Sequence, residues 1–352
     1  MKKIMNLLMG IFGLVFSLQL FADLNTNVTT DPGLSVENKT FYDMALIEEA
    51  SPHLVHDQFG QKRPIPKNGG KKIEFRRYAS LPKALTPLTE GVTPNGRKLS
   101  ASAIEAEVQQ YGDYICLSDV LDLTAIDHNV LEATKASGRQ AGLTLDTITR
   151  NVLQSGTNVF YCPPVDENGK VTGANPTDRG GLTKDCKLTV NVVKRIVTML
   201  KTANAPKIGK DYVCILHPHC AYDLTNDPKW EEAHKYASPE EIYDGEIGRI
   251  AGCRFVETSE AAIYTGAEND CPDGLAVYAP LFLADGAYGV TEVTGGGLQT
   301  IIKQLGSAGT ADPLNQRSTV GWKAMKTAEI LMEAYMVRCE CCGEFSDEAE
   351  AN

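Results

Sequence analysis

The sequence predicts a mixed α+β fold organised around one long helix. Residues 119–154 carry apolar side chains at spacings of three and four, which is typical of an amphipathic helix. Residues 72–118 instead contain short stretches that alternate apolar and polar side chains, as half-exposed strands do. Helices and strands follow no regular βαβ order, and no segment repeats at a fixed period. We therefore expect neither a doubly wound parallel sheet nor a repeat architecture.

The composition is that of a globular protein. The chain has 352 residues, of which 43% are hydrophobic and 22% charged, so wholesale disorder is not expected. The formal net charge of −11 argues against a protein that wraps nucleic acid, although it is compatible with a local basic patch. After the opening residues, no apolar run reaches the roughly 18 residues of a membrane-spanning helix. We expect no membrane partner.

The opening residues, MKKIMNLLMGIFGLVFSLQLFAD, have the form of an export signal. Two lysines precede a long apolar run, and Ala22 stands where a peptidase would cut. Cleavage there would leave Leu20, rather than a small residue, at the third position before the cut, which weakens this interpretation. A polar stretch without periodicity follows, and then a short helix is expected to end before Pro52.

Two strands joined by a long excursion are expected over residues 72–118. Ile73 and Phe75 alternate with polar neighbours, and so do Ile104 and Ala106. The intervening PKALTPLTEGVTPNGRKL has three prolines and two glycines, which exclude a continuous helix or a central strand. Such a long loop without a core of its own is uncommon inside a compact domain. We therefore expect the excursion to lie on a neighbouring subunit.

The long helix of residues 119–154 is expected to be capped by Ser118 and Asp119 and to stop at Gly156. Its predicted apolar face consists of Leu123, Ile126, Val130, Leu131, Thr134, Ala141, Leu145, Ile148 and Val152. Further elements are expected as a helix in residues 188–206, a strand at Tyr212–Leu216, a polar helical piece in 227–248, and strands within 249–264, 273–290 and 320–337.

The ten cysteines are scattered except for Cys339, Cys341 and Cys342. Disulfide scaffolds are short and have little core, whereas this chain has the apolar content for a core, so mostly reduced thiols are expected. Cys116 and Cys214 lie in strand-like runs and are expected to be buried as small hydrophobes. The C-terminal CECC lacks the spacing of a zinc knuckle; it would serve intermolecular disulfides or, as we prefer, a solvated tail.

No catalytic site is predicted. The HPHC run at residues 217–220 has two histidines that would suit zinc, but Pro218 indicates a turn at the end of a strand instead. His53 and His56 are expected to be structural. PKNGGKK and TGGGLQT both fail the patterns of phosphate-binding and dinucleotide-binding loops. We therefore expect no catalytic residue, no metal and no cofactor.

Five longer stretches carry a family resemblance. They are TFYDMALIEEASPHLVHDQFGQKRPIPKNGGKKIEFRRYASLPKALTPLTEGVTP, VQQYGDYICLSDVLDLTAID, QAGLTLDTITRNVLQSGTN, GRIAGCRFVETSEA and GSAGTADPLNQRSTVGWKAM. These stretches resemble the major capsid proteins of tailed double-stranded DNA phages, in the branch typified by coliphage N-four. The resemblance covers about residues 33–338. It implies the HK97-type capsid fold and a structural role without enzymatic activity.

The resemblance also implies how the chain is divided. The expected parts are an N-terminal leader and arm (1–67), an extended loop (68–118), a peripheral domain with the spine helix (119–184), an axial domain (185–300), a return to the peripheral domain (301–340) and an acidic tail (341–352).

The partners implied are other copies of the chain, in hexamers and pentamers of an icosahedral head. The head would enclose double-stranded DNA, touched loosely and without specificity, and scaffold, portal and decoration proteins are further candidates. The protein would reside in the virion after assembly in the cytoplasm of a bacterial host. Contact-making residues are expected at the tip of the extended loop: Pro87, Leu88, Thr89, Glu90, Val92, Pro94, Asn95, Arg97 and Lys98.

Two other assignments stay open. An encapsulin-like compartment shell has the same fold without being viral, and an exported cell-envelope enzyme is favoured only by the opening residues and the cysteines. The LQLFA ending of the opening run also resembles the leader of many phage capsid proteins. We therefore expect the opening run to be an assembly or processing segment, with Met5 and Met9 as alternative starts.

Overall fold

The computed structural model describes residues 44–50, 54–66, 70–78, 81–88, 90–93, 95–124, 129–166, 169–234, 248–292, 297–307 and 312–352. The chain divides into two compact units, residues 1–45 and 46–352. Of the first unit, only Met44 and Ala45 are described, and both are helical. The predicted leader and most of the predicted arm therefore lie outside the described residues. The short helix expected before Pro52 is confirmed over residues 44–50.

A five-stranded sheet forms around the long strand β14 (Arg317–Ile330). One edge of β14 pairs antiparallel with β4 (Gln109–Ser118), and the other edge pairs antiparallel with β13 (Gln299–Lys303) and β12 (Tyr288–Glu292). The short β1 (Gln61–Lys62) lies parallel to β12. Side chains of β14 alternate between buried and less buried over most of its length, because one face of the strand is covered.

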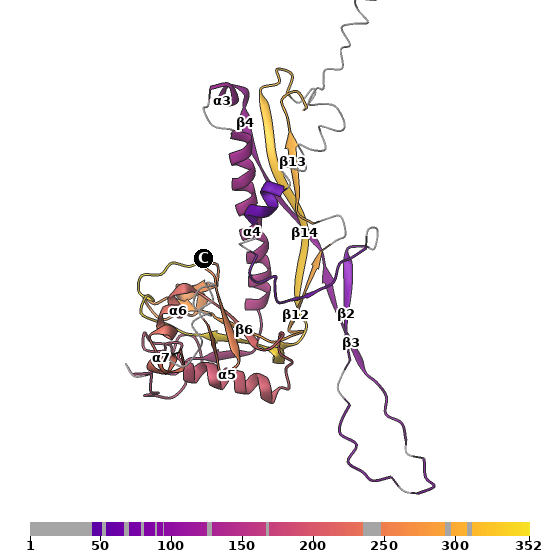
Figure 1. Ribbon diagram of the computed structural model, residues 1–352, viewed down its shortest axis with the longest axis vertical. Coiled ribbons are helices and arrows are strands. Elements are labelled where there is room, and N and C mark those ends of the chain that lie inside the picture. The colour runs from indigo at the N-terminus through magenta and orange to yellow at the C-terminus, as the bar shows by residue number, and fades with distance from the viewer. Residues whose placement is uncertain are drawn as a thin grey trace, which may run out of the picture. The chain divides into compact units, whose positions relative to one another are not determined.

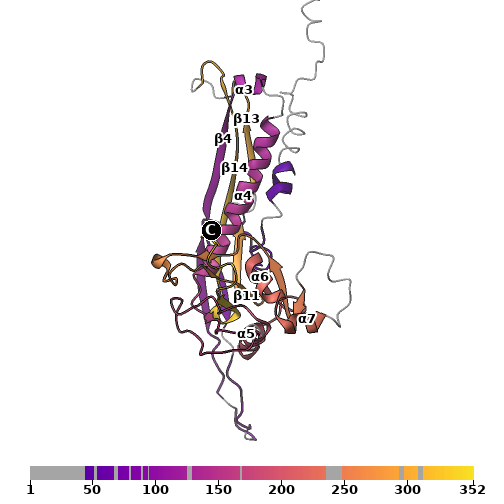
Figure 2. The same cartoon turned by 90° about the vertical axis from the view of Figure 1, so that its left-hand side faces the viewer.

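The helix α4 (Asn129–Gln154) covers this sheet (Figures 1 and 2). Ala141 and Leu145 of α4 pack against Trp322 and Ala324 of β14. The predicted long helix is therefore confirmed from residue 129 to 154, and α4 runs through its internal glycines without a break.

The first turns of the predicted helix form a separate element, α3 (Asp119–Thr124), and residues 125–128 lie outside the described part. Leu123 was expected on the buried face, but 84% of it is exposed. The reason is its place: the amide of Asp119 donates to the carbonyl of Gln316 (3.0 Å), so α3 starts just beyond the last paired residues of β4 and β14. Among the described residues, the pairing of β4 with β14 ends at Ser118 and Arg317 and does not extend to Leu123.

The strands predicted on either side of the excursion are confirmed as β2 (Lys72–Tyr78) and β3 (Ala101–Glu107), which pair antiparallel. The next strand, β4, belongs to the five-stranded sheet through its pairing with β14.

A second, six-stranded sheet has the order β5 (Val159–Tyr161), β15 (Met336–Glu340), β11 (Leu281–Leu283), β6 (Tyr212–Leu216), β8 (Cys253–Glu257) and β7 (Arg249–Ile250). The predicted strand at Tyr212–Leu216 is confirmed as β6, which is buried along its whole length. The division of the chain that the resemblance implies stays a prediction.

The helix α5 (Val190–Thr202) packs against the six-stranded sheet and confirms the second predicted helix. Its buried face consists of Val190, Val192, Val193, Ile196, Val197 and Leu200, which join Phe255 and Phe282 in the largest apolar cluster among the described residues. The smaller elements are α6 (Pro218–Thr225), α7 (Pro228–His234), the pair β9 (Ile263–Tyr264) and β10 (Val277–Tyr278), and the 3-10 turns η3 (Ala267–Asn269) and η5 (Glu333–Tyr335). The polar helical piece is confirmed only as α7, since residues 235–247 are not described.

Buried polar contacts fix residues 56 and 57 to the helix α4 and to the strand β14. His56 pairs through Nδ1 with Oδ2 of Asp146 on α4 (2.6 Å), and its amide donates to Oδ1 of the same carboxylate (2.7 Å). Asp57 accepts a hydrogen bond from Thr149 of α4 and pairs with Lys326 of β14. These contacts confirm a structural role for His56, whereas His53 is outside the described residues.

Candidate subunit interface

The excursion between β2 and β3 has no core. Every described residue from 81 to 100 is exposed, and Figure 1 shows this segment extending away from the two sheets. Exposed side chains here include large apolar ones; Leu85 is 81% exposed and Leu88 is 78% exposed. Burying a leucine stabilises a protein by about 1.5–3 kcal/mol, and several such side chains held together in water mark an interaction surface.

The predicted contact residues lie together on this excursion. Those that the structure describes are Pro87, Leu88, Glu90, Val92, Asn95, Arg97 and Lys98, and all are exposed. Thr89 and Pro94 fall outside the described residues. Whether these side chains touch another subunit stays a prediction. Leu81, Leu85 and Leu99 are exposed as well, and they were not among the predicted contact residues. Their place among the prolines of the same excursion was a signal for adding them to that set.

The base of the excursion is fixed to the five-stranded sheet. Phe75 of β2 is buried against Gly289 of β12, where a Cβ atom would lie 2.7 Å from the phenyl ring. The guanidinium of Arg63 lies over the same ring, 5.6 Å from its centroid. A loop with a rigid base and an uncovered tip is suited to bind a surface outside its own chain.

A second exposed apolar surface, the distal patch, lies at the start of α3. It consists of Val120, Leu121, Leu123, Leu305 and Leu314. The hydrogen bond from Asp119 to Gln316 brings α3 beside the segment that holds Leu314, so residues nearly two hundred positions apart meet at one end of the sheet. The sequence did not reveal this surface, because the helical spacing of Leu123 indicated burial.

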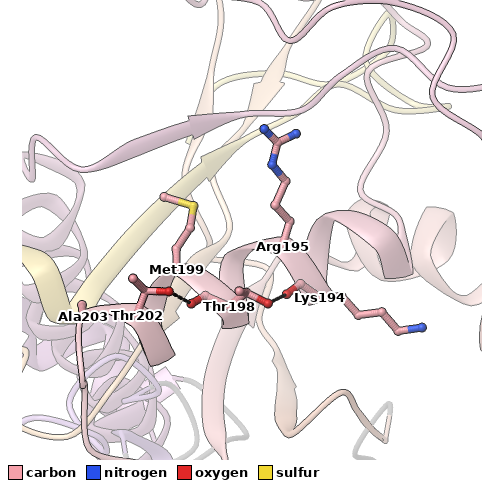
Figure 3. Close-up of a pocket in the computed structure, with 6 residues that line it drawn as sticks. All are labelled: Lys194, Arg195, Thr198, Met199, Thr202 and Ala203. Atoms are coloured by element: carbon pink, nitrogen blue, oxygen red, sulfur yellow. Dashed lines mark hydrogen bonds between the residues drawn. The ribbon is translucent and has the colours of Figure 1, made fainter.

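The outer face of α5 is polar and basic (Figure 3). Lys194, Arg195, Thr198, Met199, Thr202 and Ala203 line an open hollow of about 640 Å³. The hydroxyls of Thr198 and Thr202 each donate to the carbonyl four residues earlier (2.8 Å). The guanidinium of Arg195 lies over the ring of Phe160, 5.2 Å from its centroid, and donates to Asn175 (3.2 Å).

The histidines of HPHC serve the start of α6. His217 is the N-cap, and its Nδ1 accepts a hydrogen bond from the amide of His219 (3.2 Å). The Nδ1 of His219 lies 2.7 Å from the hydroxyl of Tyr278. Burial, with a smaller effect of His219, lowers the pKa of His217 to about 4. Among the described residues, no three histidine, cysteine or acidic side chains are placed to hold a metal ion.

A fully buried carboxylate of the six-stranded sheet is paired with two arginines. Glu340 of β15 accepts two hydrogen bonds from the guanidinium of Arg179 (2.7 and 2.6 Å) and pairs with Arg338 at 3.0 Å. These hydrogen bonds raise the pKa of Arg179. The aromatic ring of Tyr264 lies 4.0 Å from the same guanidinium. Because every charge has a partner, we interpret this cluster as a clamp between β15 and the loop before α5.

All ten cysteines are free thiols. The Sγ atom of Cys162 lies 3.3 Å from that of Cys339, and the Sγ atom of Cys220 lies 3.7 Å from that of Cys341. Burial raises the pKa of the thiols of Cys162 and Cys220. Cys214 is buried as expected, but Cys116 is exposed and corrects the prediction, because it lies on the uncovered face of β4.

The C-terminal residues are packed and are not the solvated tail that we expected. Cys339, Cys341 and Cys342 are fully buried, and Tyr278 of β10 exchanges main-chain hydrogen bonds with Cys341. Further along, the side chain of Asn352 accepts a hydrogen bond from Arg150 (3.0 Å) and donates to the carbonyls of Ser259 and Ala261. The acidic composition of this segment concealed the burial of Cys341, Cys342 and Ser346 among its exposed carboxylates.

Three features define the HK97-like capsid fold. They are the helix α4 on the sheet around β14, the strand pair β2–β3 that carries an extended loop, and the six-stranded sheet with α5, called here the six-stranded unit. Three solved phage capsid structures have this arrangement. The predicted fold class is therefore confirmed. Among the described residues, no helix is long and apolar enough to cross a bilayer.

The likeness to each of these structures spans most of both chains. The cyanophage Pam1 capsid subunit matches with a TM-score of 0.62 and 14% identity over 84% of this chain and 93% of that one. The Ralstonia phage GP4 capsid matches with a TM-score of 0.59 and 14% identity over 84% of this chain and 90% of that one. The cyanophage P-SCSP1u capsid matches with a TM-score of 0.58 and 12% identity over 83% of this chain and 89% of that one. No family model and no curated protein sequence matches the chain.

Proposed function

We propose that this chain is the major capsid protein of a tailed double-stranded DNA phage. Copies of it assemble into the hexamers and pentamers of an icosahedral head. The observation that carries the proposal is the exposed excursion of residues 81–100, which presents apolar side chains on a rigid base within an HK97-like fold. A chain that folds in this way leaves one element to be completed by a neighbour.

The geometry supports assembly through contacts between unlike surfaces. The excursion of one subunit is covered by the surface of the next, and repetition of such a heterologous contact closes a ring. Each leucine of the excursion that becomes buried contributes about 1.5–3 kcal/mol before the entropy of ordering the loop is subtracted. The distal patch supplies a separate contact at the far end of the sheet.

The proposal includes a structural role without catalysis and a place in the virion after assembly in the cytoplasm of a bacterial host. It also includes scaffold, portal and decoration proteins as partners, and membership of the branch typified by coliphage N-four. The long sequence stretches that resemble that branch support its last part. The polar groups of the six-stranded unit support a role without catalysis, because His217 and Glu340 have structural partners.

Negative-stain electron microscopy of the purified full-length protein tests the proposal. We expect closed shells, or rings of five and six subunits, under conditions that favour assembly. A species that stays monomeric under every salt, pH and crowding condition would contradict it. Particles recovered from infected cells separate a phage head from an encapsulin-like compartment, because only the former contain nuclease-protected double-stranded DNA.

A further inference from the structure

The charges of this acidic chain are segregated. Residues 186–210 contain six lysines and arginines and no aspartate or glutamate, although the whole chain has 45 acidic residues. This segment includes all of α5 and the turn that leads to β6. An uninterrupted run of one sign within a chain of the opposite sign points to a partner of opposite charge.

Five of these cations are exposed. Lys194, Arg195 and Lys201 lie on α5 and are called the α5 basic face, and Lys207 and Lys210 lie on the turn that follows it. None of the five forms an ion pair with a described carboxylate. Lys187, the sixth cation of the segment, is excluded because it pairs with Glu344 and Asp223. The remaining positive charge is therefore not neutralised within the described part of the chain.

The positions of the side chains suit a phosphate backbone. Lys194 and Lys201 are seven residues apart, so they lie on one side of α5 about 10 Å apart along the axis, with Thr198 between them. Arg195 is held by Phe160 and Asn175, and Figure 3 shows it and Lys194 extending away from the helix. The hollow beside them is open to solvent.

A protein partner fits this face less well. Cores of protein interfaces are depleted in lysine and enriched in aromatic side chains. Among the residues that line the hollow, Met199 is the only large apolar one, and it is 38% exposed. Lysine, arginine and hydroxyl side chains without an apolar centre are instead the groups that contact the DNA backbone without reading its sequence.

We propose that the α5 basic face binds the phosphate backbone of double-stranded DNA without sequence specificity. The proposal rests on the proposed function, since a capsid shell encloses the DNA, and it names the surface that makes the contact. Each subunit supplies only a few phosphate contacts, so a single contact is weak and salt-sensitive. Many subunits together hold the outer layer of DNA without fixing its register.

Fluorescence anisotropy tests the proposal with full-length unassembled subunits and a labelled duplex of roughly 30 base pairs of mixed sequence. The test variant is Lys194→Gln/Arg195→Gln/Lys201→Gln. The matched control is Lys71→Gln/Lys83→Gln/Lys303→Gln, which removes the same charge from exposed positions outside α5 and its neighbouring loop. We expect the test variant to bind at least about tenfold more weakly at about 50 mM salt, and its slope of log K against log salt to fall by about 2–3. The control should keep the slope of the unchanged protein.

Equal losses in both variants would overturn the proposal, because the effect would then come from net charge. Absence of binding by the unchanged protein would overturn it as well. A test variant that binds DNA normally but forms no shells would assign the face to a subunit contact and would also overturn it. Shell formation is scored separately by electron microscopy of the unchanged protein, so failure of the proposed function is distinguishable from failure of this inference.

Discussion

The six-stranded unit and the extended loop differ in where their apolar side chains lie. In the former, Val193, Ile196 and Leu200 of α5 are fully buried against the sheet within a single chain. In the loop, every described residue between 81 and 100 is exposed, including several leucines. One region is therefore stabilised by its own chain, whereas the other keeps its apolar surface for a contact outside it. Substitutions should accordingly affect folding in the first region and assembly in the second.

The largest effect on folding is expected in the charge clamp of the six-stranded unit. Glu340→Gln removes the buried carboxylate that pairs with the partly buried Arg179 and Arg338, and breaking a buried ion pair costs about 3–5 kcal/mol. Chemical denaturation of the unassembled subunit measures the loss. Asp347→Asn, which breaks the exposed pair with Lys184, is the control and should change stability little. Equal stabilities of the two variants would show that the clamp is not a structural element.

An intermediate effect is expected where the helix of residues 44–50 crosses α4. A Cβ atom at Gly138 would lie 2.8 Å from the carbonyl oxygen of Leu46, so Gly138→Ala forces the two helices apart. We expect a loss of about 1–3 kcal/mol, as for other overpacked sites. Thermal and denaturant unfolding measure whether Gly138→Ala lowers or raises the free energy of unfolding. Helix propensity alone predicts a gain of about 1 kcal/mol, and that result would contradict the close approach.

A smaller, pH-dependent effect is expected at the N-cap of α6. The folded-state pKa of His217 is lowered to about 4, whereas the unfolded chain takes up a proton near 6.5. The unfolded state therefore binds more protons between these values, and the stability contributed by the neutral ring is lost as pH falls from about 6.5 to 4. His217→Asn keeps a capping side chain but does not titrate.

We expect the wild type to lose at least about 1 kcal/mol relative to His217→Asn between pH 7 and pH 4, because the buried neutral ring of His217 resists protonation in the folded state. Urea denaturation of both proteins over this range provides the comparison. Parallel stability profiles would contradict the assignment of a lowered pKa.

The smallest effect on folding is expected in the extended loop. Leu85→Ser/Leu88→Ser should change the free energy of unfolding of the isolated subunit by less than about 0.5 kcal/mol, because neither side chain is buried. The same variant should fail to form shells, as judged by electron microscopy and sedimentation. Normal shells from the variant, or a clear loss of subunit stability, would remove the contrast between the two regions.

Local patterns in the sequence were sufficient for the elements whose environment repeats along the chain. The spacing of Val190, Val193, Val197 and Leu200 predicted α5 and its buried face, because one surface of that helix meets the sheet over its whole length. The prolines of residues 82–99 likewise predicted the excursion. The resemblance to phage capsid proteins added the fold, which residue patterns alone did not specify.

Long-range contacts account for the errors. Leu123 has helical spacing but lies beyond the end of the sheet, and Cys116 alternates correctly but faces away from α4. The C-terminal segment is acidic, yet Cys341 and Cys342 complete the core beside Tyr278. In each case burial is decided by which distant segment lies opposite. The tip residues of the loop, from Pro87 to Lys98, stay a prediction for the same reason, since their partner belongs to another chain.

Hydrogen exchange tests the central claim most directly. Backbone amides of residues 81–100 are compared in the unassembled subunit and in assembled shells, with the amides of β6 as an internal reference. Our account predicts fast exchange of this segment in the free subunit and at least about tenfold slower exchange in shells, with β6 protected in both. Fast exchange of residues 81–100 in both states would show that no neighbour covers the loop and would contradict the account.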